Sequence, residues 1–379
     1  MATRKKIALT YYYSENWVAG SYYVQNIIRA FKSLPDAERP RLAILYEKEQ
    51  GLGEVKAIGY PYIDYVNTSS GNKGLLYRLF RRLSIGLFKK DLLLERRLSG
   101  TEYIFEGNEH FPFIPNHYYW VHDFQQCRLP GFFSEEEAAA RSALPRKVAR
   151  MEDATLILSS YDALNDFNTF FPGYKCRVKV LRFASSLPDI SDVDYTASKS
   201  GFDIREPFFL CSNQFWQHKN HRLVLEAVRL LKAKDLAFQV IFTGKTYDYR
   251  TPEYFPRLEA FVKEHQLECL IKFLGFIDRK VQLSLAQHAV SYIQPSLFEG
   301  WSTTVEDAKY LNKHVLLSDI PVHREQMKEN VSFFDPADPS DLAAKMERVL
   351  AVPPVIVRND YKKNIETFGR DLNEAFSIS

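Results

Sequence analysis

Short apolar runs alternate with amphipathic stretches along the first half of the chain. The run at 6–11 (KIALTY) predicts a buried strand, and Tyr23, Ile27, Ile28 and Phe31 then repeat at helical spacing. Further strands are expected at 42–46, 103–105, 118–121, 155–159 and 178–181. Because strands that alternate with helices form parallel sheets covered on both faces, this half predicts a Rossmann-like α/β domain.

The same alternation resumes after a segment of different character. Residues 185–206 are rich in Ser, Asp and Pro and have no hydrophobic period, which indicates a linker. The strands expected after it are 208–211, 238–243, 271–274, 290–293 and 314–317, and the helices are 222–232, 254–266, 281–288 and 304–311. We therefore expect an N-terminal domain at 1–184 and a C-terminal domain at 207–359, with ligands bound beyond the carboxyl ends of the strands.

Composition and charge exclude several classes of protein. The chain has 379 residues, 46% hydrophobic, and a net charge of +3, which is too small to indicate nucleic-acid binding. The four cysteines lack the spacing of a metal or redox site, so we expect reduced thiols in a cytoplasmic protein. No signal peptide is predicted, and no apolar run approaches the ~18 residues of a membrane-spanning helix, so any membrane contact would be peripheral.

One basic stretch, residues 73–97, stands out. It holds eight basic residues against two acidic ones, with leucine, isoleucine and phenylalanine between them. A basic amphipathic helix can lie on an anionic membrane, here the inner face of the membrane, or it can pack on the sheet with its basic side in water. The sequence leaves both interpretations open.

The stretch at 293–327 combines features that suit a nucleotide sugar. A strand ends at Ile293, a loop carries Glu299 and Gly300, and a helix is expected to begin near Thr303. Helix starts favour anions, and glycine allows a ligand to approach the backbone closely. A loop carboxylate can hold sugar hydroxyls, and a second carboxylate one or two turns later can hold a ribose.

This stretch resembles the retaining family 4 (group 1) glycosyltransferases of the GT-B fold, of bacterial type. The resemblance rests on Pro295-Ser296, Glu299-Gly300 and Asp307-Ala308, and it continues through 315–325. It implies two facing Rossmann-like domains, with the C-terminal helix (360–379) crossing back to the first domain. It also implies a nucleotide-diphosphate sugar as donor, and no cofactor or metal.

The second acid of the motif departs from the family, which usually has glutamate where Asp307 stands. Glu306 lies beside it and would be able to substitute. Thr303 and Glu306 also form a capping-box pattern, in which Glu306 bonds back to the helix start. We therefore favour Asp307 for the ribose.

Other segments match the family residue by residue. Lys219 matches a lysine that binds the donor diphosphate, while the partner arginine of the family falls on Asn213 or Gln214, with His218 or Arg222 as a substitute. The resemblance assigns catalytic roles to Glu299, His122, Asp123 and Lys219, with His122 near the donor sugar and Asp123 at the acceptor hydroxyl. It assigns donor binding to Gly20, Ser21, Asn213, Gln214, Lys219, Gly275, Phe276, Ile277, Glu299, Gly300, Trp301, Ser302, Thr303, Glu306 and Asp307.

The resulting hypothesis is transfer of a sugar to a glycan or lipid-linked acceptor hydroxyl, with retention of anomeric configuration, in polysaccharide, lipopolysaccharide or glycoconjugate synthesis. Two alternatives remain open at this point. A nucleotide-sugar epimerase of the same fold needs no acceptor, and a donor-binding pseudoenzyme needs no chemistry. The donor sugar and its base are not identified by the sequence.

Overall fold

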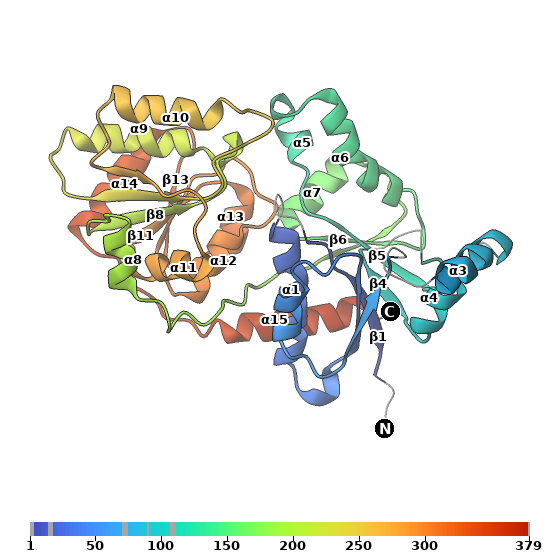
Figure 1. The fold of residues 1–379 in the computed structure, drawn as a ribbon. Coiled ribbons are helices and arrows are strands. Elements are labelled where there is room, and N and C mark those ends of the chain that lie inside the picture. Colours follow the sequence, from blue (N-terminus) through green and yellow to red (C-terminus); the bar gives the residue numbers. More distant parts are fainter. Residues whose placement is uncertain (1–3, 14–17, 70–74, 89–90, 107–110, 378–379) are drawn as a thin grey trace.

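A computed structural model describes residues 4–13, 18–69, 75–88, 91–106 and 111–377. The described chain forms two α/β units, each built on a parallel sheet with helices on both faces (Figure 1). Each sheet is buried because Ile, Val, Leu and Phe occupy consecutive strand positions, as expected for a sheet covered on both sides. The predicted GT-B arrangement of two Rossmann-like units is confirmed.

The first sheet has the strand order β3-β2-β1-β4-β5-β6-β7, and all its pairs are parallel. Its strands are β1 (Lys6–Thr10), β2 (Arg41–Tyr46), β3 (Ile63–Asn67), β4 (Tyr103–Phe105), β5 (Asn116–Val121), β6 (Thr155–Leu158) and β7 (Arg177–Val180). The order reverses beside β1, so a crevice opens at the carboxyl ends of β1 and β4. That edge of the sheet faces the second unit.

The second sheet has the order β10-β9-β8-β11-β12-β13, again parallel throughout. Its strands are β8 (Phe208–Ser212), β9 (Gln239–Thr243), β10 (Ile271–Phe273), β11 (Ser291–Gln294), β12 (Val315–Ser318) and β13 (Val331–Phe334). Here the order reverses between β8 and β11. The loops that follow these two strands therefore meet at one point, and the candidate site lies there.

Helices cover both sheets, and short 3-10 turns occur at Asp36–Glu38, Pro130–Phe132 and Gln217–Lys219. The helices are α1 (Val18–Ser33), α2 (Leu52–Ala57), α3 (Leu75–Phe88), α4 (Leu92–Arg97), α5 (Gln125–Arg128), α6 (Glu135–Val148), α7 (Tyr161–Phe170), α8 (Tyr195–Gly201), α9 (His221–Lys232), α10 (Tyr254–Glu264), α11 (Arg279–His288), α12 (Thr303–Tyr310), α13 (Pro321–Gln326), α14 (Pro339–Ala351) and α15 (Lys362–Ala375).

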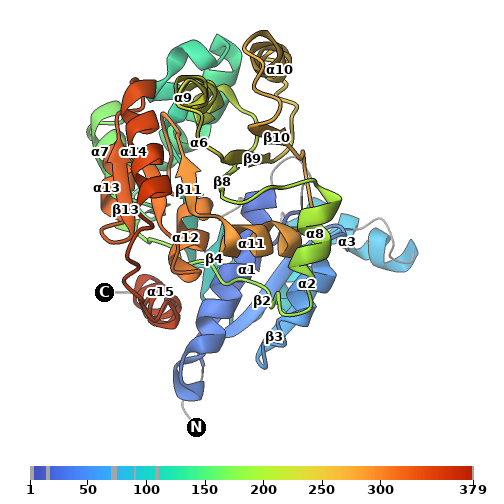
Figure 2. The same cartoon turned by 90° about the vertical axis from the view of Figure 1, so that its left-hand side faces the viewer.

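The last helix, α15, crosses back from the second unit and packs across α1 of the first (Figures 1 and 2). The two helices touch so closely that a Cβ on Gly369 would lie 2.6 Å from the carbonyl oxygen of Ala30. Phe368, Leu372 and Phe376 are buried in the core of the first unit. The predicted return of the C-terminal helix is thus observed, with residues 378–379 outside the described part.

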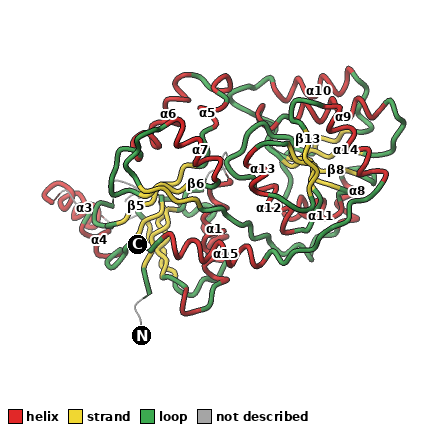
Figure 3. Tube along the Cα trace, turned by 180° about the vertical axis from the view of Figure 1, so that it is seen from behind, coloured by secondary structure: helices red, strands yellow, loops and turns green. Residues whose placement is uncertain are grey.

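Three features differ from the sequence-based expectation. The segment predicted as a linker contains α8, which packs against α11. The strands β3 and β13 were not anticipated. The basic stretch at 73–97 forms two helices, α3 and α4, of which α3 lies at the end of the molecule opposite the second unit (Figures 1 and 3). Lys73, Lys89 and Lys90 of that stretch lie outside the described residues.

Candidate active site

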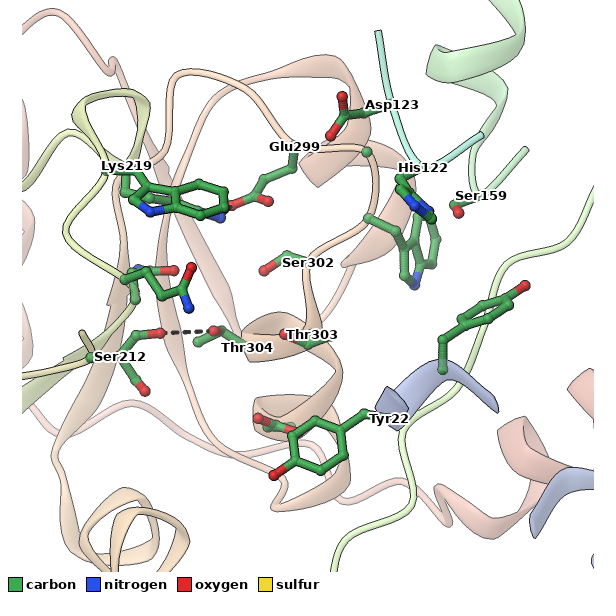
Figure 4. A pocket seen from close by; sticks show the side chains of 18 of the residues that line it. Tyr22, His122, Asp123, Ser159, Ser212, Lys219, Glu299, Ser302, Thr303 and Thr304 are labelled. Atoms are coloured by element: carbon green, nitrogen blue, oxygen red, sulfur yellow. Dashed lines mark hydrogen bonds and ion pairs between the residues drawn. The ribbon is translucent and has the colours of Figure 1, made fainter. Parts of the chain in front are cut away.

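A cleft of about 370 Å³ lies between the two units, at the carboxyl ends of their strands (Figure 4). We call its two sides the first-domain wall and the second-domain wall. The first-domain wall is formed by Tyr22, Tyr23, Trp120, His122, Asp123, Arg141 and Ser159. The second-domain wall is formed by Asn213, Gln214, Trp216, Lys219, Phe276, Ile277, Arg279 and the run from Glu299 to Thr304, with Asp307.

An ion pair between Lys219 and Glu299 lies at the centre of the second-domain wall. Lys219 Nζ is 2.6 Å from Glu299 Oε1, and the two side chains are 16% and 9% exposed. The same carboxylate oxygen accepts hydrogen bonds from Gln294 Nε2 at 2.8 Å and Ser296 Oγ at 2.7 Å. Water therefore screens this charge pair weakly, and its carboxylate is held in one orientation by neutral donors.

Gln294 connects this ion pair to the sheet. It is the last residue of β11 and fully buried, and its Oε1 accepts a hydrogen bond of 2.8 Å from Asn213 Nδ2 at the end of β8. The two strand ends at which the sheet order reverses are thus joined by a polar chain of Asn213, Gln294, Glu299 and Lys219. Such a satisfied buried network fixes its members before any ligand binds.

The start of α12 lines the cleft next to the ion pair. Ser302 is the N-cap and accepts from the backbone N–H of Val305, while Thr304 Oγ1 donates to the carbonyl oxygen of Ser212 at 3.0 Å (Figure 4). The hydroxyl of Thr304 thereby holds the helix start against the end of β8. The positive end of the α12 dipole lies at the cleft, where it favours an anionic ligand.

The capping box expected between Thr303 and Glu306 is wrong. Ser302, one residue earlier, caps the helix, and Glu306 turns away from it. The Glu306 carboxylate is 1% exposed and accepts hydrogen bonds from Gln326 Nε2 at 2.9 Å and from the hydroxyl of Tyr361. Glu306 is not among the residues that line the cleft. It binds α12 to α13 and to the start of α15, because a buried carboxylate must find donors.

Asp307 faces the cleft, unlike its neighbour. Its Oδ2 is 2.6 Å from Nη2 of Arg279, at the start of α11, whereas its buried Oδ1 has no hydrogen-bond partner in the described structure. Burial raises the pKa of this carboxyl group above its ordinary value, against the opposing effect of the Arg279 guanidinium. An acceptor oxygen without a partner in a ligand cleft is suited to a hydroxyl donor.

The first-domain wall is mainly aromatic. The ring of His122 packs edge-on against Trp120 with 3.9 Å between centroids, and Trp120 Nε1 donates to Ser159 Oγ at 3.1 Å. Burial lowers the pKa of His122 to about 4, so its imidazole is neutral near pH 7. Arg141 Nη2 of α6 donates to Asp123 Oδ1 at 2.7 Å, which places a cation on this wall.

The two walls touch at Gly300. A Cβ on Gly300 would lie 2.1 Å from the backbone oxygen of His122, a distance that no side chain tolerates. Beside it, Trp301 Nε1 donates to the carbonyl oxygen of Phe183 at 3.1 Å. The glycine of the Glu-Gly pair therefore permits close approach of one domain to the other.

The remaining predicted residues are distributed unevenly. Gln214, Phe276 and Ile277 line the cleft, with Phe276 70% exposed, and Gly275 directly precedes them. Gly20 and Ser21 lie in α1 outside the lining residues, and Ser21 Oγ donates to the carbonyl oxygen of Tyr12. The loop before them includes residues 16–17, which lie outside the described part. Their donor-binding role stays a prediction.

Arg222 does not replace the arginine that the motif lacks. It pairs with Glu226 at 2.7 Å and lies over the ring of Phe261, away from the cleft. The cleft instead receives cations that sequence reasoning missed, Arg279 and Arg141. Arg279 stands in the run FIDRK, two residues after a predicted site residue, which was the available signal. Gln294, directly before Pro295, was missed in the same way.

Comparison with known proteins agrees with this architecture. The family model described as glycosyl transferases group 1 matches residues 193–368. The O-antigen chain mannosyltransferase RfbU of Salmonella typhimurium is 25% identical over 176 residues, which are 45% of this chain and 48% of that protein. The alignment thus spans about half the length of this curated relative.

Solved structures match over nearly the whole chain. HepE of Anabaena, in complex with UDP and glucose, has a TM-score of 0.65 at 15% identity, covering 98% of this chain and 99% of that one. WaaG, a glycosyltransferase involved in lipopolysaccharide biosynthesis, has a TM-score of 0.61 at 12% identity, covering 98% of each chain. These likenesses show the fold. The family match adds that residues 193–368 are similar to the group 1 glycosyl transferases.

Proposed function

We propose that this chain transfers a sugar from a nucleotide-diphosphate sugar to a hydroxyl of a glycan or lipid-linked acceptor, with retention of anomeric configuration. The observation that carries the proposal is the buried pair of Lys219 and Glu299 at the start of α12. A cation beside a helix start suits a diphosphate, and the adjacent carboxylate suits sugar hydroxyls. UDP and glucose in HepE support a ligand of this class.

The groups on the second-domain wall are assigned along the donor. Asp307 accepts from the ribose through its open Oδ1, and backbone groups at Phe276 and Ile277 approach the base. Lys219 and the α12 start neutralise the diphosphate, whose negative charge grows as the leaving group departs. Glu299 holds the transferred sugar. Arg279 favours the ionised form of Asp307, against the effect of burial, which raises the pKa of this carboxyl group.

The reaction breaks the bond between the anomeric carbon and the phosphate oxygen and forms a bond from that carbon to the acceptor oxygen on the same face. The acceptor proton passes to the departing phosphate. Neutral His122 can accept or donate one hydrogen bond to the sugar without adding charge, and Asp123 positions the acceptor hydroxyl. The proposed reaction uses no resident metal or cofactor, and the neutral aromatic wall excludes water from the reacting carbon.

Binding is tested first. We expect the melting temperature to rise with one of UDP, GDP, dTDP or ADP and with its sugar conjugates, because a ligand of the native state adds stability by mass action. The Asp307→Asn protein should show a smaller rise with the same ligand. A chain that gains no stability from any of the four nucleotides and their sugars would contradict the donor assignment.

Turnover is tested next. Release of the nucleoside diphosphate should require an acceptor glycan, and proton NMR of the product should show the anomeric configuration of the donor. Donor incubated alone separates the other chemistries: a new sugar epimer without acceptor would indicate epimerase activity. Binding without any turnover across acceptor extracts would indicate a pseudoenzyme, and an inverted anomeric centre would refute retention.

A further inference from the structure

The helix α3 exposes an apolar surface far from the cleft. Five of its described side chains are large, apolar and open to solvent: Leu79 is 54% exposed, Phe80 51%, Leu83 53%, Ile85 44% and Leu87 74%. All of them except Ile85 lie along one side of the helix. We call these four residues the α3 stripe. Phe80, Leu83 and Leu87 follow Leu79 by one, four and eight residues. At 3.6 residues per turn these positions lie on one face of the helix. A contiguous exposed apolar face of this kind marks an interaction site.

The opposite side of α3 attaches the helix to the protein through polar contacts. Arg81 Nε forms an ion pair with Asp91, the N-cap of α4, and Arg81 Nη1 donates to the carbonyl oxygen of Thr68 at 3.2 Å. Ser84 is 3% exposed on this side. Surface helices usually bury their apolar face and leave the polar face in water. Among its described side chains, α3 has the reverse arrangement.

The apolar contact with the core is made instead by α4, which packs beside α3. Leu94 and Leu98, within and directly after α4, are buried in a core cluster of the first domain. No residue of the α3 stripe belongs to a core cluster in the described structure. The stripe is therefore not needed to hold the fold together.

Exposed arginines surround the stripe. Arg82 lies three residues after Leu79, at the edge of the same face, and Arg96 and Arg97 are exposed at the end of α4. None of these three arginines has an acidic side chain within ion-pair distance in the described part of the chain. Apolar side chains flanked by unpaired arginines complement an anionic lipid surface. The apolar side chains would enter the boundary between headgroups and acyl chains, and the arginines would contact the anionic headgroups.

We propose that the α3 stripe docks this protein on an anionic lipid bilayer. A second copy of the chain fits the surface less well. The 14 residues of α3 rise about 21 Å, so four side chains offer a few hundred Å², well below the roughly 800 Å² per partner of a stable dimer. In such a dimer the arginines beside the α3 stripe would also lie close to the same arginines of the second copy and repel them. The proposal does not rest on the proposed transfer reaction.

The test is flotation of the full chain with vesicles of phosphatidylcholine alone or of equal parts phosphatidylcholine and phosphatidylglycerol. The wild-type protein should float with the anionic vesicles and remain at the bottom with the neutral ones. Leu79→Ser, Leu83→Ser and Leu87→Ser combined should lower the bound fraction about tenfold or more, since each removes apolar surface from the lipid. Arg82→Glu with Arg97→Glu should weaken binding to anionic vesicles only.

A matched control removes exposed apolar side chains elsewhere. Val352, Val355 and Val357 are 67%, 91% and 47% exposed in the segment between α14 and α15. Their serine variants should float like the wild type, and all variants should retain the same melting temperature. The proposal is overturned by a wild-type protein that does not float, by equal loss in both serine sets, or by sedimentation that shows a dimer abolished by Leu83→Ser.

Discussion

The two walls of the cleft are built differently. On the second-domain wall, polar side chains from β8, β11 and the α12 start are buried and bonded to one another, as in the chain from Asn213 through Gln294 to Glu299. On the first-domain wall, Trp120 and the neutral ring of His122 pack by shape, and the ion pair of Asp123 with Arg141 is partly exposed. One wall is organised for charge before a ligand binds, and the other for shape.

This difference assigns separate tasks to the two domains. A preorganised charged wall supplies affinity for a phosphate-bearing donor, because no reorganisation is needed when the ligand arrives. A mainly aromatic wall can bind acceptor molecules of different structure, and it can help to close the cleft. Four experiments test this division, from the largest expected effect to the smallest.

Lys219→Met should break the charged wall. We expect turnover to fall by ~10²–10³-fold, as for loss of one transition-state donor. The free energy of unfolding should drop by ~3 kcal/mol, because Glu299 is left buried without its cation. Adding Glu299→Gln should restore most of the stability and none of the activity. Full activity in Lys219→Met would show that the pair of Lys219 and Glu299 is not part of the active site.

Gly300→Ala should break the contact between the walls. Its Cβ would lie 2.1 Å from the His122 carbonyl oxygen, so the two walls must separate. The side chains on the two walls would then be displaced relative to one another. We expect turnover to fall roughly 100-fold, since displacements near 1 Å have such effects. Gly53→Ala is the matched control, because a Cβ there meets nothing within 4 Å. Equal activity of the two variants would speak against closure through Gly300.

Asp307→Asn and Glu306→Gln should separate binding from structure within one helix. Asp307→Asn should raise the KM for the donor about tenfold, the size of one hydrogen bond to a charged group. Glu306→Gln should leave KM unchanged and lower the free energy of unfolding by ~1–2 kcal/mol, since Tyr361 and Gln326 lose a charged acceptor. Donor titrations and urea unfolding measure the two effects. A raised KM in Glu306→Gln together with lost stability in Asp307→Asn would instead assign donor binding to Glu306 and the structural role to Asp307.

Acid should destabilise the first-domain wall through His122. The folded-state pKa is about 4 and the ordinary value is 6.5, so the unfolded chain binds more protons between these limits. The stability from neutral His122 is present above pH 6.5 and is lost as the pH falls toward 4. His122→Asn should reduce the pH slope of the unfolding free energy by up to ~1.4 kcal/mol per unit. Urea titrations between pH 4 and 7 measure it; identical slopes would mean that His122 is solvated.

Local pattern was sufficient to predict most of the fold. The strands β1 and β8 contain continuous apolar runs, and α12 follows a motif of fixed spacing. The short partly buried strands β3 and β13 have no comparable run, and α8 lies in a polar segment. Their placement depends on contacts with neighbouring elements that a local period does not encode.

The candidate site was only partly predictable for a related reason. Glu299 and Lys219 carry motif positions, so their identity was visible, but their ion pair joins residues 80 positions apart. The sequence favoured Asp307 over Glu306 for the ribose, but it did not reveal that Glu306 bonds to Tyr361 and that Asp307 pairs with Arg279. The sequence also left the face of α3 undecided, because an amphipathic pattern does not state which side meets the protein.

The return of α15 to the first domain has a consequence for synthesis on the ribosome. Tyr361, Phe368, Leu372 and Phe376 complete a core that otherwise begins with β1 and α1. Residues 207–359 are translated between these two parts, which takes on the order of 10 s at ~5–20 residues per second. During that interval the part of α1 that α15 covers in the folded protein stays exposed. The nascent chain therefore finishes its second domain first, and its first domain is the part that a chaperone would hold.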